Sequence, residues 1–382
     1  MPIIDPTGTA LPISSETIWR EVQFLDQGLS HTPFYDTIQR RATKVFRTGR
    51  SFSEIAQFSE DWVESDDLCD HLASYHLHNH DFQLVRFEYS LETEDGRPYI
   101  LVHESEEVFR WVFDSFGMHE SLLYHFIYDT AGIVQYNTTQ ENSMTLHFFL
   151  KGLSYSILWV YDPVLLTNRA IKLVSETIEG DNASEEFDSQ LKSQISVIDH
   201  PLCLVLAYVC AVVLDRTTRL VMRSRQTIED FEDDTGFDGL RVSHARRRGR
   251  VGPQVEETRR YREMSKSLGS SAVALLDIAH RLKLVKVICN TVLETKEEPN
   301  FLQWLPSDYW RDYFRNRQNI IESKSRFLQR TIETTVDRAE LYQARANIHL
   351  NVVSIHSGQI PQPLLSNRSL GLQPHRSSRN GS

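Results

Sequence analysis

The sequence contains no hydrophobic run long enough to cross a membrane. Its longest apolar segment, residues 202–214, has thirteen residues, whereas a transmembrane helix needs roughly 18 or more. We therefore expect a buried helix here, continued by an amphipathic helix through Ile228, and no membrane span. The opening residues, MPIIDPTGTALP, lack the basic and apolar segments of a secretory signal. A cytoplasmic protein is expected.

Cysteine and the common catalytic motifs are also scarce or absent. The four cysteines stand at 69, 203, 210 and 289, without a CxxC pair, so no disulfide framework is indicated and a reducing compartment fits. The chain has no HExxH, Walker-type glycine-rich loop or GxSxG elbow, which removes the usual support for metalloproteases, P-loop hydrolases and α/β-hydrolases. We predict a non-enzymatic protein, without assigned catalytic or cofactor-binding residues.

The charge excludes a generally basic nucleic-acid-binding protein, because the net charge is −11. A local basic run, residues 241–250, follows an acidic stretch, residues 229–234. The two blocks screen one another, so we interpret them as a solvated loop and expect no nucleic-acid partner.

What is present is a composition typical of a folded chain, with 40% hydrophobic and 10% aromatic residues. Residues 16–28, 33–47 and 53–63 have helical patterns. A hairpin is predicted from 82–89 and 99–102, and a helix capped by Ser105 follows, with Val108, Phe109, Val112, Phe113 and Phe116 on its buried face. A helix over 119–128 and extended segments over 144–150, 155–162 and 169–174 complete the first half.

The second half is predicted to be helical, with helices near 254–294 and 306–356. The aromatic group at 304–314 is expected to dock the last helix onto the domain. That helix carries an apolar stripe that we expect to fold back within one chain, formed by Ile332, Val336, Ala339, Ala346, Leu350 and Val353.

The predicted fold class is α+β, with an α/β/α N-terminal part built on a mostly antiparallel sheet, followed by a helical part that ends in a long stalk-like helix. The predicted organisation is a flexible arm at 1–15, an α/β domain at 16–190, a helical region at 191–357 and a disordered tail at 358–382.

Two groups of side chains are candidates for metal binding. His76, His78 and His80 alternate, so an extended backbone places three imidazoles on one side, as zinc or copper could use. Asp66, Asp67 and Asp70 form a carboxylate cluster that could hold Mg²⁺ through water. For both groups the alternative is an ordinary hydrated surface, and the cofactor that the sequence as a whole suggests is Mg²⁺.

Several short segments together resemble the fungal CorA-like magnesium transporter superfamily, over about residues 80–357. They are Ser105-Glu106-Glu107-Val108-Phe109, the strand from Tyr155 to Asp162 leading to Asn168-Arg169-Ala170, His200-Pro201-Leu202, Ile228-Glu229 running to Thr235-Gly236, and Asp337-Arg338-Ala339 with Asn347 and Val352-Val353.

The resemblance implies an α/β/α cytoplasmic domain and a long stalk helix that leads into membrane helices. It also implies pentamers in which carboxylates between neighbouring domains sense Mg²⁺. This chain departs from the pattern, because it has no Gly-Met-Asn motif and no apolar span after His356.

The sequence therefore favours a soluble CorA-like domain with a regulatory or interaction role, with partners that are further copies of itself or membrane transporter subunits. The alternatives are an interaction scaffold unrelated to ion transport, a truncated transporter fragment, and an enzyme whose site is assembled from distant residues.

Overall fold

The computed structural model describes fourteen stretches of the chain, which leave out the predicted histidine run, the loop around 241–250 and the predicted tail. They are residues 2–4, 10–14, 18–19, 21–24, 42–49, 57–74, 82–94, 97–128, 132–140, 143–152, 154–176, 183–235, 254–294 and 307–356. Contacts divide the chain into two units. Unit 1 comprises residues 1–221 and 277–338, and unit 2 comprises residues 222–276 and 339–382.

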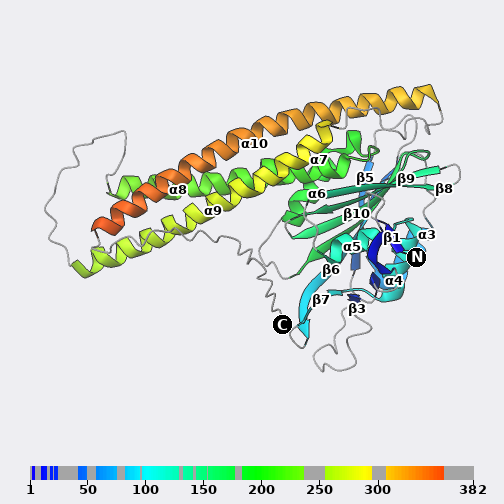
Figure 1. Ribbon diagram of the computed structural model, residues 1–382, viewed down its shortest axis with the longest axis horizontal. Coiled ribbons are helices and arrows are strands. Elements are labelled where there is room, and N and C mark those ends of the chain that lie inside the picture. Colours follow the sequence, from blue (N-terminus) through cyan, green and yellow to red (C-terminus); the bar gives the residue numbers. More distant parts are fainter. Residues whose placement is uncertain are drawn as a thin grey trace, which may run out of the picture. The chain divides into compact units, whose positions relative to one another are not determined.

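Unit 1 is built on one nine-stranded mixed sheet (Figure 1). Its main path runs β3-β7-β6-β11-β10-β9-β8, and β4, next to β5, pairs with the first half of β6. The strands are β3 (Val22–Phe24), β4 (Ala42–Gly49), β5 (Gln57–Glu64), β6 (Phe82–Glu94), β7 (Arg97–Val102), β8 (Ile133–Gln140), β9 (Ser143–Lys151), β10 (Tyr155–Asp162) and β11 (Thr167–Ser175). A separate antiparallel pair joins β1 (Pro2–Ile4) and β2 (Ala10–Ser14).

The predicted mostly antiparallel sheet is confirmed. Only β6 with β11 and β3 with β7 pair in parallel among the described strands. The predicted hairpin is β6 with β7, and the three predicted extended segments are β9, β10 and β11. In β10, every residue from Tyr155 to Tyr161 is buried, as expected for a central strand covered on both faces.

The helical predictions for 33–47 and 53–63 are wrong where the structure describes these residues. Residues 42–49 and 57–64 form β4 and β5, which pair antiparallel from Ala42 opposite Glu64 to Gly49 opposite Gln57. Residues 22–24, within the first predicted helix, form β3. Pairing with the distant strands β6 and β7 decides the conformation here, because β propensity depends strongly on tertiary neighbours.

Helices cover both faces of the sheet in unit 1. On one face lie α3 (Ser65–Ala73), α4 (Glu106–Ser115) and α5 (Ser121–Ile127), which bury Leu68, Phe109, Phe113 and Leu122 against strand residues such as Val85. The Ser105 cap of α4 is confirmed, because its Oγ accepts a hydrogen bond of 3.2 Å from the backbone N–H of Val108.

The other face of the sheet carries α6 (Ala183–Ser193), the short 3₁₀ turn η2 (Ile195–Val197) and α7 (Cys203–Cys210). Trp159 of β10 donates its indole N–H to the carbonyl of Pro201 at 3.0 Å, and Asn168 of β11 donates to the carbonyl of Ile198 at 2.9 Å. This face therefore combines apolar packing with buried hydrogen bonds, and the α/β/α layering is confirmed.

In the second half of the chain the described residues are helical, as predicted. After α7 come the π-helical turn η3 (Ala211–Thr217), α8 (Thr218–Thr235), α9 (Gln254–Glu294) and α10 (Asp308–His356). All of Cys203 to Val213 is buried, which confirms the predicted buried helix. None of the helices in the described stretches is both long enough and apolar enough to cross a membrane.

The start of α10 docks within unit 1. Phe314 stacks on His200 with ring centroids 4.4 Å apart, and the hydroxyl of Tyr313 donates to Asp199 at 2.5 Å. The predicted apolar stripe is buried within the single chain at Ile332, Ala339, Ala346 and Val353. Its other members, Val336 and Leu350, are half-buried.

Unit 2 holds α8 and α10 together through a buried polar contact. Glu232 accepts hydrogen bonds from Arg345 at 2.5 Å and pairs with His349 at 2.8 Å, while Phe231 packs against the His349 ring. A carboxylate with two such partners can be buried without an unpaired charge.

Candidate metal site

Three strands bring a histidine and two glutamates together in unit 1. Glu88 lies in β6, His103 directly follows β7, and Glu176 directly follows β11. Their ligand atoms all lie within 4.8 Å of one another, and within the described stretches no other three His, Cys, Asp or Glu residues meet this condition. We call these residues the three-strand cluster.

Backbone pairing fixes the spacing of the three-strand cluster. The N–H of His103 donates to the carbonyl of Glu88 at 2.9 Å, and the N–H of Glu176 donates to the carbonyl of Tyr89 at 2.9 Å. The parallel register places Val174 opposite Glu88 and ends with Ser175 opposite Tyr89. Glu176 is the next residue along the chain and still lies beside β6. The three side chains are therefore carried by a rigid part of the sheet.

His103 is the most buried member of the cluster, with 6% of its side chain exposed, against 46% for Glu176. Its Nδ1 lies 3.3 Å from Oε1 of Glu176, and its Nε2 lies 3.0 Å from the hydroxyl of Ser90. Glu88 contacts Arg86 of the same strand at 3.2 Å. The cluster thus has a sheltered nitrogen end and a solvent-accessible carboxylate end.

This arrangement can hold one divalent cation. Imidazole nitrogen and carboxylate oxygen are common protein ligands for such ions, and three protein ligands leave positions for water. Without an ion, the contacts of Arg86 with Glu88 and of His103 with Glu176 supply ordinary electrostatic partners.

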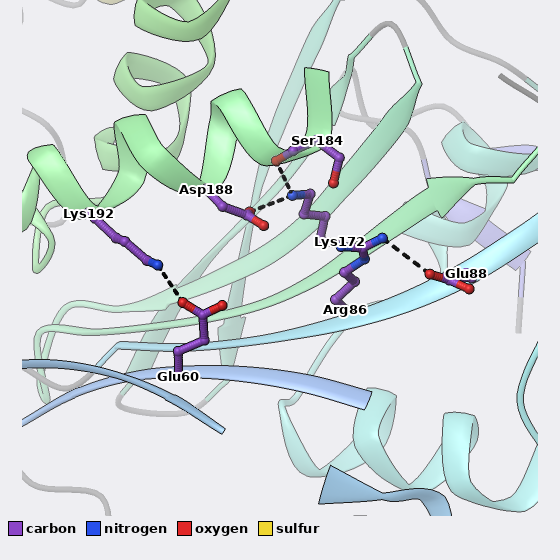
Figure 2. A network of polar contacts seen from close by, with 7 residues as sticks. All are labelled: Glu60, Arg86, Glu88, Lys172, Ser184, Asp188 and Lys192. Atoms are coloured by element: carbon purple, nitrogen blue, oxygen red, sulfur yellow. Dashed lines mark hydrogen bonds and ion pairs between the residues drawn. The ribbon is translucent and has the colours of Figure 1, made fainter. Parts of the chain in front are cut away.

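Figure 2 shows a second polar network on the same sheet, between β11 and α6. The ammonium of Lys172 contacts Asp188 at 2.5 Å and donates to the carbonyl of Ser184 at 2.8 Å. The side chain of Lys172 is fully buried, and its ammonium lies over the rings of Tyr155 and Phe187. With no solvent access for Lys172, the network is suited to joining α6 to the sheet.

Two further histidines are buried as neutral side chains. Burial lowers the pKa of His147 to about 3, helped by the nearby His119. Burial likewise lowers the pKa of His200 to about 3, against the opposing effect of Asp199. His147 lies 2.8 Å from the hydroxyl of Thr138, and His200 Nδ1 accepts from the N–H of Leu202 at 3.1 Å.

The structure places the predicted aspartate candidates on α3, away from such a cluster. Asp66 and Asp67 lie in the first turn, where carboxylates favour the helix dipole, and both are exposed, as is Asp70. They are not part of the three-ligand group described above. Metal binding there stays a prediction, and His76, His78 and His80 lie outside the described residues.

Sequence reasoning missed the three-strand cluster, although part of its signal is local. Two of the three residues, His103 and Glu176, directly follow the ends of strands, where ligands often lie. His103 lies beside Glu88 because β6 and β7 form the predicted hairpin, whereas Glu176 comes close to Glu88 only through the parallel pairing of β6 with β11, which no local pattern reveals. In comparisons with known proteins, no family model matches the sequence and no curated protein matches it.

Proposed function

We propose that the chain is a non-enzymatic regulatory domain that binds a divalent cation at the three-strand cluster. The observation that carries this proposal is the meeting of one imidazole and two carboxylates, from three strands, within 4.8 Å. A cation held there connects the end of β7, the end of β11 and the middle of β6, so its binding is coupled to the stability of the sheet.

The sequence resemblance supports the same role. A CorA-like cytoplasmic domain senses divalent cations through carboxylates, and we propose that this chain is a diverged CorA-like domain that keeps cation sensing. Its partners in this proposal are further copies of itself or subunits of a membrane transporter.

A second candidate is an interaction scaffold unrelated to ions. One observation favours it, namely that α9 exposes the large apolar side chains Leu284 and Val287 in unit 1, at 63% and 61%. Exposed apolar groups on a helix are suited to a protein partner. A chain whose stability does not respond to any divalent cation would favour this candidate.

The test is thermal unfolding of the full chain after treatment with a chelator, with and without added Mg²⁺, Mn²⁺, Ca²⁺ or Zn²⁺. A cation at about 100 times its Kd stabilises the folded state by about 2.7 kcal/mol, so at least one of these ions should raise the Tm by several degrees. The double variant Glu88→Gln/Glu176→Gln should lose this shift.

The matched control is Glu92→Gln, which alters an exposed glutamate of the same strand outside the cluster and should keep the full shift. A wild-type Tm that no ion raises, or a shift that survives the double variant, would contradict the proposal.

A further inference from the structure

We propose that the three-strand cluster is selective for a transition-metal ion of the zinc class over Mg²⁺, with Nδ1 of His103 as the deciding ligand and Ser90 as its positioning residue. This inference rests on the proposed function, since it specifies which ion the same site takes.

The cluster offers one imidazole nitrogen as well as carboxylate oxygens as metal ligands. Mg²⁺ prefers an octahedral shell of oxygen ligands and keeps several waters, whereas imidazole nitrogen suits Zn²⁺ and its neighbours in the first transition row. The nitrogen end of this cluster is also its sheltered end, because the His103 side chain is 6% exposed. An ion that accepts nitrogen gains a preformed ligand there that Mg²⁺ uses poorly.

The distance between two of the ligand atoms is close to that in a tetrahedral zinc site. Four ligands at about 2.1 Å from a tetrahedral zinc ion lie roughly 3.4 Å from one another. His103 Nδ1 and Glu176 Oε1 are 3.3 Å apart, which matches one edge of such a tetrahedron. The third residue, Glu88, offers a carboxylate oxygen within 4.8 Å of a ligand atom of each of the other two residues, which is near enough for side-chain rotation to complete the set.

The second imidazole nitrogen of His103, Nε2, has a hydrogen-bond partner in Ser90. Nδ1 can bind a metal only when it carries no proton, and the neutral ring then has its proton on Nε2. That nitrogen lies 3.0 Å from the Oγ of Ser90, a buried residue of β6. The Ser90 hydroxyl can accept this N–H and so hold the ring in the tautomer and orientation that metal binding requires.

A bound cation competes with a guanidinium group for the carboxylate of Glu88. Arg86 lies 3.2 Å from Glu88 and balances its charge when no cation is bound. A divalent ion at the cluster must compete with this guanidinium for the carboxylate. Because Mg²⁺ binds imidazole nitrogen weakly, it gains less from His103 than Zn²⁺ does. Mg²⁺ should therefore displace Arg86 from Glu88 less readily than Zn²⁺.

The experiment is isothermal titration of the full chain with Zn²⁺ and, separately, with Mg²⁺. A background in which His76, His78 and His80 are replaced by asparagine and Cys69 by serine removes the predicted histidine run and the one cysteine that is not buried. We expect Zn²⁺ to bind this background more tightly than Mg²⁺, and Ser90→Ala to lower the zinc affinity about 10–100-fold. His103→Gln should remove the preference for zinc.

A second readout on the wild-type cluster is Co²⁺ absorption, whose visible bands report nitrogen ligation and tetrahedral geometry. It keeps the inference testable if His103→Gln fails to fold. Equal affinity for Mg²⁺ and Zn²⁺, or a zinc affinity unchanged by both Ser90→Ala and His103→Gln, would overturn the selectivity and leave the proposed function standing. Failure of every ion to bind would overturn both and leave His103 and Glu176 as an ion pair only.

Discussion

Replacing Lys172 by alanine is expected to lower the free energy of unfolding by about 3–5 kcal/mol. The substitution removes the cation that Asp188 contacts at 2.5 Å, and it leaves a carboxylate that is almost fully buried without its charged partner. It also removes the contacts of the ammonium with the rings of Tyr155 and Phe187. Urea denaturation followed by circular dichroism measures the loss.

Two controls separate the buried charge from the loss of side-chain volume. Lys192→Ala breaks the ion pair with Glu60 shown in Figure 2. Because the side chain of Lys192 is 45% exposed, this loss should cost no more than about 1 kcal/mol. The double variant Lys172→Met/Asp188→Leu replaces both charges by apolar groups and should recover most of the stability. If Lys172→Ala cost no more than Lys192→Ala, Asp188 would not depend on this cation.

Acidification from pH 7.5 to pH 5 is expected to destabilise the protein strongly through His147 and His200. Burial lowers the pKa of each to about 3 in the folded chain, while the unfolded chain has histidines with a pKa of about 6.5. As the pH falls below about 6.5, the unfolded chain binds protons that the folded chain does not, so unfolding is favoured until about pH 3. Each histidine contributes about 1.4 kcal/mol per pH unit, which gives about 4 kcal/mol for the two at pH 5.

The measurement is urea denaturation at both pH values for the wild type and for the variant His147→Gln/His200→Asn. Asparagine can keep the acceptor that His200 offers to the N–H of Leu202, so the variant retains that local hydrogen bond. The variant should lose clearly less stability on acidification than the wild type. Parallel pH curves for the wild type and the double variant would contradict the assignment.

The parts of the fold that sequence predicts correctly are those with a strong local signal. The helix after Ser105 has a cap, acidic first-turn residues and a buried apolar face, and it forms as expected. The helical second half is likewise predicted by its periodicity. The strands β4 and β5 were predicted as helices, but long-range pairing, of β4 with β6 and of β5 with β4, sets their conformation.

The candidate site is harder to predict, because its members come from three separate segments. Glu88 is one of several acidic residues in β6, and its closeness to His103 and Glu176 distinguishes it from Glu92. His103 is placed there by the β6–β7 hairpin, and Glu176 by the parallel pairing of β6 with β11, which is a property of the whole sheet. The predicted candidates, by contrast, were chosen because they are close in sequence, and proximity along the chain gives no information about the fold around them.

Anomalous diffraction from a crystal of the full chain grown with zinc tests whether Glu88, His103 and Glu176 hold one divalent cation. Data collected on both sides of the zinc absorption edge locate the ion without reference to a model of the site. We expect an anomalous peak within bonding distance, about 2.0–2.2 Å, of His103 Nδ1 and of oxygens from Glu88 and Glu176. A well-ordered cluster without a peak, with Arg86 still on Glu88 and zinc bound only elsewhere, would contradict it.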